Sequence, residues 1–109
     1  MTEIRDFHAH IYFNPDELDA AQVLAREAQT LFGVAVGRFH QRPVGPHPRG
    51  SCQLTVGAEQ FGTFAKWLVF NRRGLTIFAH AETGNDLADH TAHVIWFGPS
   101  EALDISIFE

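Results

Sequence analysis

The chain has 109 residues, of which 45% are hydrophobic and 19% charged, and this balance predicts one folded domain over residues 1–109. The formal net charge of −5, without any Lys/Arg cluster, argues against a nucleic-acid partner. A single cysteine excludes an internal disulfide and a zinc ribbon. The sequence shows no secretory signal and no run of about 18 apolar residues, so we expect a cytoplasmic protein without a membrane partner.

Residues 4–13 are predicted to form the first strand, because side chains suited to a core alternate with more polar ones. The core-facing positions would be Ala9, Ile11 and Phe13. The opposite face would carry His8, His10 and Tyr12. Two of the seven histidines therefore stand two positions apart on one face of this strand.

A helix is predicted from Pro15 to Phe32, with Asn14 as its N-cap and Glu17 in the position of a capping-box carboxylate. Apolar residues recur at helical spacing along it, and Gly33 is the expected C-terminal stop. The recurring positions are Leu18, Ala21, Leu24, Ala25, Ala28, Leu31 and Phe32.

The rest of the chain is divided by breaks in the apolar pattern. Residues 41–50 hold three prolines and two glycines, which excludes regular structure there. The helix at 59–70 is so apolar that we expect cover on more than one side, and Trp67 and Trp96 are assigned to the core. The remaining elements are strands at 34–40 and 51–56, the helix at 59–70, and strands at 75–80 and 93–97.

The order β-α-β-β-α-β with one short extra C-terminal strand predicts an α+β fold of the ferredoxin-like sandwich type, an antiparallel sheet with both helices on one face. The other face would be open, and its mixed polarity suits neither bare exposure to water nor a core. We therefore expect it to be a ligand site, the interface of a homodimer, or both. Its expected residues are His8, His10, Tyr12, Gln53, Thr55, Phe78 and His80.

Five histidines are expected at one end of this open face. In the predicted sheet the first strand lies between the third and the fourth, parallel to the third and antiparallel to the fourth. The starts of the first and third strands would then share an edge with the ends of the second and fourth. The histidines at those places are His8, His10, His40, His47 and His80.

The His8 and His10 pair predicts a metal site. Their Cα atoms would lie about 6.6 Å apart, so both imidazoles can bind one ion. His80 on a neighbouring strand is well placed as a third ligand, and imidazole suits Fe, Zn, Cu and Ni. The alternative is that these are structural histidines held by hydrogen bonds, the usual role of a lone histidine in a sheet.

Two loops and a helix end carry further candidate groups. Prolines on both sides of His47 fix the backbone, which suits a general acid or base, although an exposed histidine without a role is the alternative. Asp89 and His90 are either catalytic or metal-supporting groups, or only polar loop residues. Arg72 either complements the end of its helix or binds a substrate carboxylate through two hydrogen bonds.

Several stretches form a recognisable set: FHAHIYF at 7–13, GPHP at 45–48, WLVFNR at 67–72, and His80 followed by TGND at 83–86 and DHT at 89–91. As a set they resemble the DOPA 4,5-dioxygenase family of fungal betalain pigment formation and its bacterial relatives. The resemblance implies a ferredoxin-like subunit, a dimer, and extradiol cleavage of a catechol by O2 at a non-haem metal, usually Fe(II). Asn85 departs from the pattern, which has Asp there. The remaining candidates for a carboxylate ligand are Glu82, Asp86 and Asp89, unless the site is all-histidine.

The resulting hypothesis is an extradiol dioxygenase that opens the ring of L-DOPA or a related catechol with O2. Fe(II), or Zn or another divalent ion in purified protein, would bind His8, His10 and His80. The alternative is a non-catalytic, dimeric module of the same fold that binds a metal or a small ligand; another oxygenase or a hydrolase is also compatible with this scaffold. The groups assigned to the reaction are His47 and His90 as catalytic residues, and His40, Arg72 and Tyr12 as substrate-binding residues.

Overall fold

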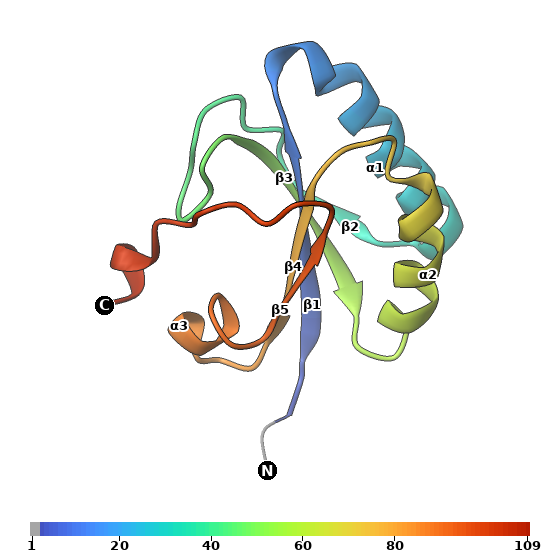
Figure 1. The fold of residues 1–109 in the computed structure, drawn as a ribbon. Coiled ribbons are helices and arrows are strands. Elements are labelled where there is room, and N and C mark those ends of the chain that lie inside the picture. The colour runs from blue at the N-terminus through green and yellow to red at the C-terminus, as the bar shows by residue number, and fades with distance from the viewer. Residues whose placement is uncertain (1–2) are drawn as a thin grey trace.

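Apolar side chains on one side of each strand build a sheet in the order β2-β3-β1-β4-β5, in a computed structural model that describes residues 3–109 (Figure 1). Figure 1 shows two helices, α1 and α2, on one side of the sheet, and α3 with the C-terminal segment on the other. The predicted ferredoxin-like α+β sandwich is confirmed. The strands are β1 (Asp6–Phe13), β2 (Ala35–Val36), β3 (Gly50–Gly57), β4 (Ile77–Glu82) and β5 (Val94–Phe97). The helices are α1 (Leu18–Phe32), α2 (Phe61–Asn71) and α3 (Asp86–Asp89), with 3-10 turns η1 (Pro15–Glu17) and η2 (Ile105–Phe108).

The central strand β1 is antiparallel to both of its neighbours, so the predicted parallel pairing of the first and third strands is wrong. The crossover through α1 makes β2 run parallel to β1, and the chain then reverses to pair β3 antiparallel with β2. The start of β1 therefore meets the end of β3, with Asp6 opposite Gly57, while Phe13 lies opposite Gly50. His40, which pairs with Ser51, lies at the Phe13 end of the sheet rather than beside His8.

The start of the first helix follows the predicted capping pattern. The amide of Asn14 donates to the Glu17 carboxylate at 2.9 Å, and one 3-10 turn leads into α1. Gly33 ends α1 with φ 68°, a left-handed conformation that glycine adopts without steric cost. The first crossover is thus defined at both ends by local chemistry.

The core lies between the sheet and the helices α1 and α2. Ile11 of β1 is fully buried there with Leu24 of α1 and Phe64 and Leu68 of α2. Burying one side chain of this size stabilises the fold by about 1.5–3 kcal/mol. The alternation predicted for β1 is confirmed, since the core face carries Ala9, Ile11 and Phe13.

Two assignments of apolar residues were wrong. The outer side of α2 has no cover in the described chain: Phe70 is 90% exposed and Val69 is 55% exposed, because only one side of this helix meets the sheet. Trp96 lies opposite Phe78 on the other face of the sheet, because its neighbour Phe97 takes the core position. Within residues 3–109, none of the helices has both the length and the hydrophobicity needed to span a bilayer.

The face opposite the helices is covered within the chain, which corrects the expectation of an open face. Residues 41–50, α3 and residues 98–109 fold over it. The amide of Asp104 donates to the carbonyl of Pro46, and Arg49 binds Glu101 at 2.8 Å, so the two covering segments hold each other. Beneath them, Tyr12 has no solvent exposure. A second copy of the chain therefore cannot pack on these central residues without displacing this cover.

Asp89 fastens the loop that carries α3. Its carboxylate is fully buried and accepts the amide (2.8 Å) and hydroxyl (2.6 Å) of Thr83 and Nδ1–H of His93 (2.9 Å). Burial alone would raise the pKa of Asp89, but the hydrogen bonds from Thr83 and His93 outweigh it and leave the pKa below its usual value. Asp89 thus stabilises the loop in its ionised form.

Asp89→Asn should lower the free energy of unfolding by roughly 1–3 kcal/mol, because an amide oxygen replaces two acceptors and the new N–H2 faces donors. The deficit should be complete at neutral pH and shrink as pH falls below about 4, where Asp89 takes up a proton in the unfolded wild-type chain but still resists it in the folded one. Urea unfolding at pH 7 and pH 3 measures both.

Asp86→Asn is the matched control. This substitution removes the same charge three residues earlier in the chain, from an exposed carboxylate. It should change stability by less than about 0.5 kcal/mol. Equal effects of the two substitutions would contradict the role given to Asp89.

Candidate metal centre

Three histidines from β1 and β4 meet at one point on the covered face. The pleat of β1 places His8 and His10 on the same side, and the antiparallel register puts His80 directly opposite His8. One ring nitrogen from each of the three lies within 4.8 Å of the other two. This is the set that the sequence predicts as metal ligands, and its arrangement can hold one ion.

The closest approach in the cluster joins Nε2 of His10 to Nε2 of His80, at 3.1 Å. Nδ1–H of His80 donates to the carbonyl of Ala81, so the neutral ring presents a lone pair at Nε2. Two nitrogens that bind the same zinc-sized ion, each at 2.0–2.1 Å from it, would lie about 2.9–3.4 Å from each other. The pair therefore fits either a shared proton or a shared metal ion.

Burial keeps the imidazoles of His10 and His80 neutral, which is the form that binds a metal. It lowers the pKa of His10 well below its usual value, with the charges that His47 and His80 would carry adding to the effect. Burial also lowers the pKa of His80 to about 4, although its bond to Ala81 acts in the opposite direction. An ion that binds at neutral pH therefore does not have to displace an imidazolium proton from His10 or His80.

Two carboxylates approach the cluster: that of Asp6, whose Oδ1 lies 3.7 Å from Nε2 of His8, and that of Glu82. Its Oε1 lies 3.4 Å from Nδ1 of His8 and 3.5 Å from Nδ1 of His80. Asp89 is committed to Thr83 and His93, and the side chain of Asp86 is exposed. Asp86 and Asp89 are thus unsuited as ligands, whereas Glu82 and Asp6 lie close enough to His8 to orient its ring.

His47 lies next to the cluster and is held by Tyr12. The Tyr12 hydroxyl and Nδ1 of His47 are joined by a hydrogen bond of 2.7 Å, and the ring centroids of His47 and His10 are 4.1 Å apart. Burial lowers the pKa of His47 to about 4 and raises the pKa of Tyr12 above its usual value. Both groups are neutral at ordinary pH, and Nε2 of His47 is left to act on a ligand.

His90 lies on the other side of the cluster. Its ring centroid is 4.1 Å from that of His80 and 4.4 Å from that of Phe108, which belongs to the covering C-terminal segment. Nδ1–H of His90 donates to the carbonyl of Asp86 at 2.7 Å. Asn85, the position that departs from the family pattern, accepts the amide of Ala88 and thereby caps α3, the short helix that carries His90.

The remaining predicted residues lie further along the face. His40 shares a cavity with His10 and His47, whereas Arg72 donates to the carbonyl of Leu75 at 2.7 Å and lies beside Gly98, near the opposite end of β4 from His80. The histidines are thus spread along the face instead of gathered at one edge.

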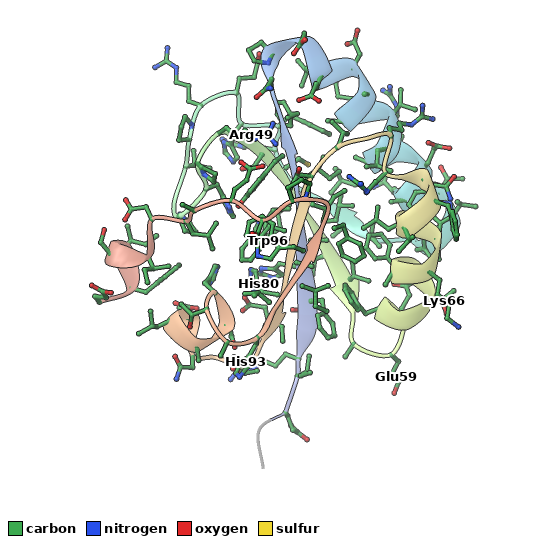
Figure 2. The ribbon with its side chains drawn as sticks, in the orientation of Figure 1. Arg49, Glu59, Lys66, His80, His93 and Trp96 are labelled. Carbon is green, nitrogen blue, oxygen red and sulfur yellow. The ribbon has the colours of Figure 1, made fainter. Side chains whose placement is uncertain are left out.

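An aromatic wall completes the face, and sequence reasoning missed part of it. Trp96 packs on Phe78 with ring centroids 4.7 Å apart and on Tyr12 at 6.1 Å. Figure 2 shows Arg49, Trp96, His80 and His93 following one another along the side of the sheet away from α1 and α2. The alternation of β5, with Phe97 in the core, is the signal that would have placed Trp96 here.

Comparisons with known proteins find similarity to dioxygenases. The model of the Dopa 4,5-dioxygenase family matches residues 7–107. A DOPA 4,5-dioxygenase of Amanita muscaria is 33% identical over 114 residues, covering 96% of this chain and 50% of its own length. An uncharacterised 21.2 kDa protein of Botryotinia fuckeliana is 33% identical over 113 residues, with coverage of 93% and 62%. The chain thus spans about half to three fifths of these curated relatives.

A solved structure from Nostoc punctiforme, described as that of a candidate dioxygenase, has the same fold. Its TM-score is 0.90 and its sequence is 39% identical, with 94% of this chain and 89% of that chain covered. The arrangement of strands and helices around the histidine cluster is therefore shared with a protein of similar length.

His10→Ala and His80→Ala should abolish stable metal binding, because two histidines alone hold a divalent ion weakly. Protein reconstituted with Fe(II) under anaerobic conditions, or with Zn(II), and then dialysed should carry about one ion per chain before substitution. Glu82→Gln should weaken the affinity roughly 10- to 100-fold by releasing the orientation of the rings. Elemental analysis and competition with a chelating dye measure these effects.

His90→Ala is the control, since its ring lies over His80 without belonging to the three-ligand set. It should keep its metal. Undiminished metal content in His10→Ala would show that the ligand assignment is wrong.

Proposed function

The chain belongs to the Dopa 4,5-dioxygenase family, and on this premise we propose that it is a metal-dependent extradiol dioxygenase that opens the ring of a catechol, L-DOPA or a related compound, with O2. The observation that carries the proposal is the pair of Nε2 atoms of His10 and His80, buried, neutral and 3.1 Å apart, with His8 beside them. The ring of His47, which can take up or release a proton, adjoins His10, and the aromatic rings of Phe78 and Trp96 line the same face.

The proposed cofactor is Fe(II), with Zn or another divalent ion in its place in purified protein. Three imidazoles fit such an ion and leave other positions around it to small ligands. When bound, Fe(II) supplies coordination of both catechol oxygens and the electron exchange that reaction with O2 requires. The protein's own part is to orient the ring of His8 through Glu82, the ring of His80 through the Ala81 carbonyl, and the ring of His10 through its packing on Phe78 and His47.

His47 is the proposed general acid or base. It is neutral at ordinary pH, so Nε2 can either accept or donate a proton. Tyr12 is fully buried and bonded to Nδ1 of His47, so the role proposed for it is to orient that ring, in place of the predicted contact with substrate. His90 is the second candidate, because it approaches the cluster from the side of α3.

The covering segments give the site the dry surroundings that strengthen electrostatic interactions. His80 is fully buried and His10 is 5% exposed, while His8 is partly exposed. His40 is proposed to contact substrate because it lines the cavity beside His10. Arg72 is proposed as a second substrate contact, through the guanidinium N–H groups that its bond from Nη1 to Leu75 leaves free.

The proposal also includes a cytoplasmic protein that works as a homodimer, with a catechol and O2 as its small-molecule partners and no nucleic-acid or membrane partner. Any dimer contact would lie outside the central residues of the histidine face, since these are covered within one chain. The competing function is a non-catalytic binding module, which the full burial of His80 would also suit.

His47→Gln should spare the metal and lower kcat with a catechol by roughly 10²- to 10⁴-fold, because the amide cannot transfer protons. The protein is reconstituted with Fe(II) under anaerobic conditions and mixed with L-DOPA and simpler catechols, and O2 uptake and the yellow ring-opened product are followed. Tyr12→Phe removes only the hydroxyl and should reduce kcat to a smaller extent.

No O2 uptake with any catechol at full Fe(II) occupancy would contradict the dioxygenase and favour the binding module. Loss of metal in His47→Gln would instead move His47 into the ligand set.

A further inference from the structure

A cavity of about 240 Å³ opens beside His10 on the histidine face. Its walls come from β1, from the first half of β3 and from the segment that connects β2 to β3. Its volume is below the range of drug-sized pockets, so it suits a small ligand. The lining residues are His10, Gly37, Arg38, His40, Val44, His47, Ser51 and Gln53.

A larger cavity, of about 390 Å³, is not a candidate for the same ligand. Phe7, Ala81 and Ile95 line it on the helix side of the sheet, near the edge formed by β5. None of the three histidines of the metal centre contributes to its walls. The smaller cavity is therefore the one that adjoins the proposed chemistry.

A bulge after β2 shapes the wall of the smaller cavity. The amide of Gly37 donates to the carbonyl of Gln53 at 2.8 Å, and His40 pairs with Ser51. Three steps along this segment thus match two steps along β3, which ends the regular pairing that was predicted to continue to residue 40.

The bulge determines which side chains face the cavity. Phe39 packs inward, with its ring centroid 6.2 Å from that of Phe13, and belongs to the side chains around the core. Its neighbours Arg38 and His40 are turned to the other side, where both line the cavity. A cation and an imidazole are thereby placed in one wall, with His10 and His47 also lining the space.

Arg38 is the charged group of this cavity. No acidic side chain of residues 3–109 lines it, and the described chain provides Arg38 with neither an ion pair nor a side-chain hydrogen bond. Other arginines are committed: Arg49 binds Glu101 at 2.8 Å and Arg73 binds Glu27 at 2.7 Å. The guanidinium of Arg38 is thus available for a carboxylate, which it can bind through two parallel hydrogen bonds.

We propose that this cavity binds the carboxylate tail of a small aromatic substrate and that Arg38 sets the specificity for it. The ring of the substrate lies toward His10 and His47, and the tail toward Arg38. Because the cavity holds no acidic side chain, an α-ammonium group finds no counter-charge there. The preferred class is therefore aromatic carboxylates in general, of which an amino acid is one member. The reaction at the ring rests on the proposed function; binding of the tail does not.

The kinetic test compares catechols with and without a carboxylate on Arg38→Gln. Loss of a charge-assisted hydrogen-bonded pair should lower kcat/KM for L-DOPA and 3-(3,4-dihydroxyphenyl)propanoate at least roughly tenfold, mainly through KM. The value for 4-methylcatechol should stay within about twofold. Arg38→Lys should recover part of the lost kcat/KM, since lysine keeps the positive charge but lacks the paired N–H donors of the guanidinium. Equal losses on all three catechols, or no loss on any, would overturn the proposal.

Arg42→Gln is the matched control, because it removes the same charge from the same segment without lining this cavity. It should leave the discrimination between the catechols unchanged. A loss of the carboxylate preference equal to that of Arg38→Gln would show an effect of net charge and overturn the role of Arg38.

A binding test separates this proposal from the proposed function. Calorimetry on metal-free protein with 3-phenylpropanoate, which has no catechol, should show binding to wild type and Arg42→Gln and at least tenfold weaker binding to Arg38→Gln. If no catechol is ever turned over but this pattern holds, the dioxygenase proposal fails and the carboxylate site stands. If catechols are turned over but 3-phenylpropanoate binds all variants equally or none, the carboxylate site fails alone.

Discussion

The antiparallel pairing of β1 with β4 is the constraint on which the whole site depends. It places His8 opposite His80, and the two-residue pleat of β1 brings His10 to the same face. A shift of one residue in this register would turn the histidines into the core and Ala9 and Ile11 out of it. The apolar contacts of the core and the geometry of the histidine cluster are therefore determined by the same pairing, on opposite faces of one sheet.

The cover over this face gives the histidines their chemical character. Burial beneath residues 41–50 and 98–109 lowers the pKa values of His10, His47 and His80, so these rings stay neutral. Seven histidines would suggest a chain whose charge swings widely near pH 6, but at least these three do not contribute to that swing. Burying polar nitrogens in the interior destabilises the fold unless each has a partner. An ion bound between Nε2 of His10 and Nε2 of His80 would give both nitrogens that partner.

The sequence was sufficient for the order of elements, the core face of β1 and the three converging histidines, because each depends on local periodicity and on a fold with few alternatives. Strand direction was misjudged for β3, and His40 was placed at the wrong end with it. The roles of Arg38, Trp96 and Asp89 depend on a bulge, on a tail that folds back and on a buried carboxylate. The bulge and the buried carboxylate are tertiary features without a repeating pattern, so the sequence held no local signal for the roles of Arg38 and Asp89; for Trp96 the alternation of β5 was such a signal.

The central claim is that His8, His10 and His80 together hold one divalent cation. A crystal structure of the Fe(II)-loaded protein, with anomalous differences recorded at the iron edge, tests it most directly. The account predicts a single peak within roughly 2–2.5 Å of Nε2 of His10, Nε2 of His80 and one ring nitrogen of His8. A peak elsewhere, for example against Asp89 and His93, or no peak at this cluster in protein that retains iron in solution, would contradict it.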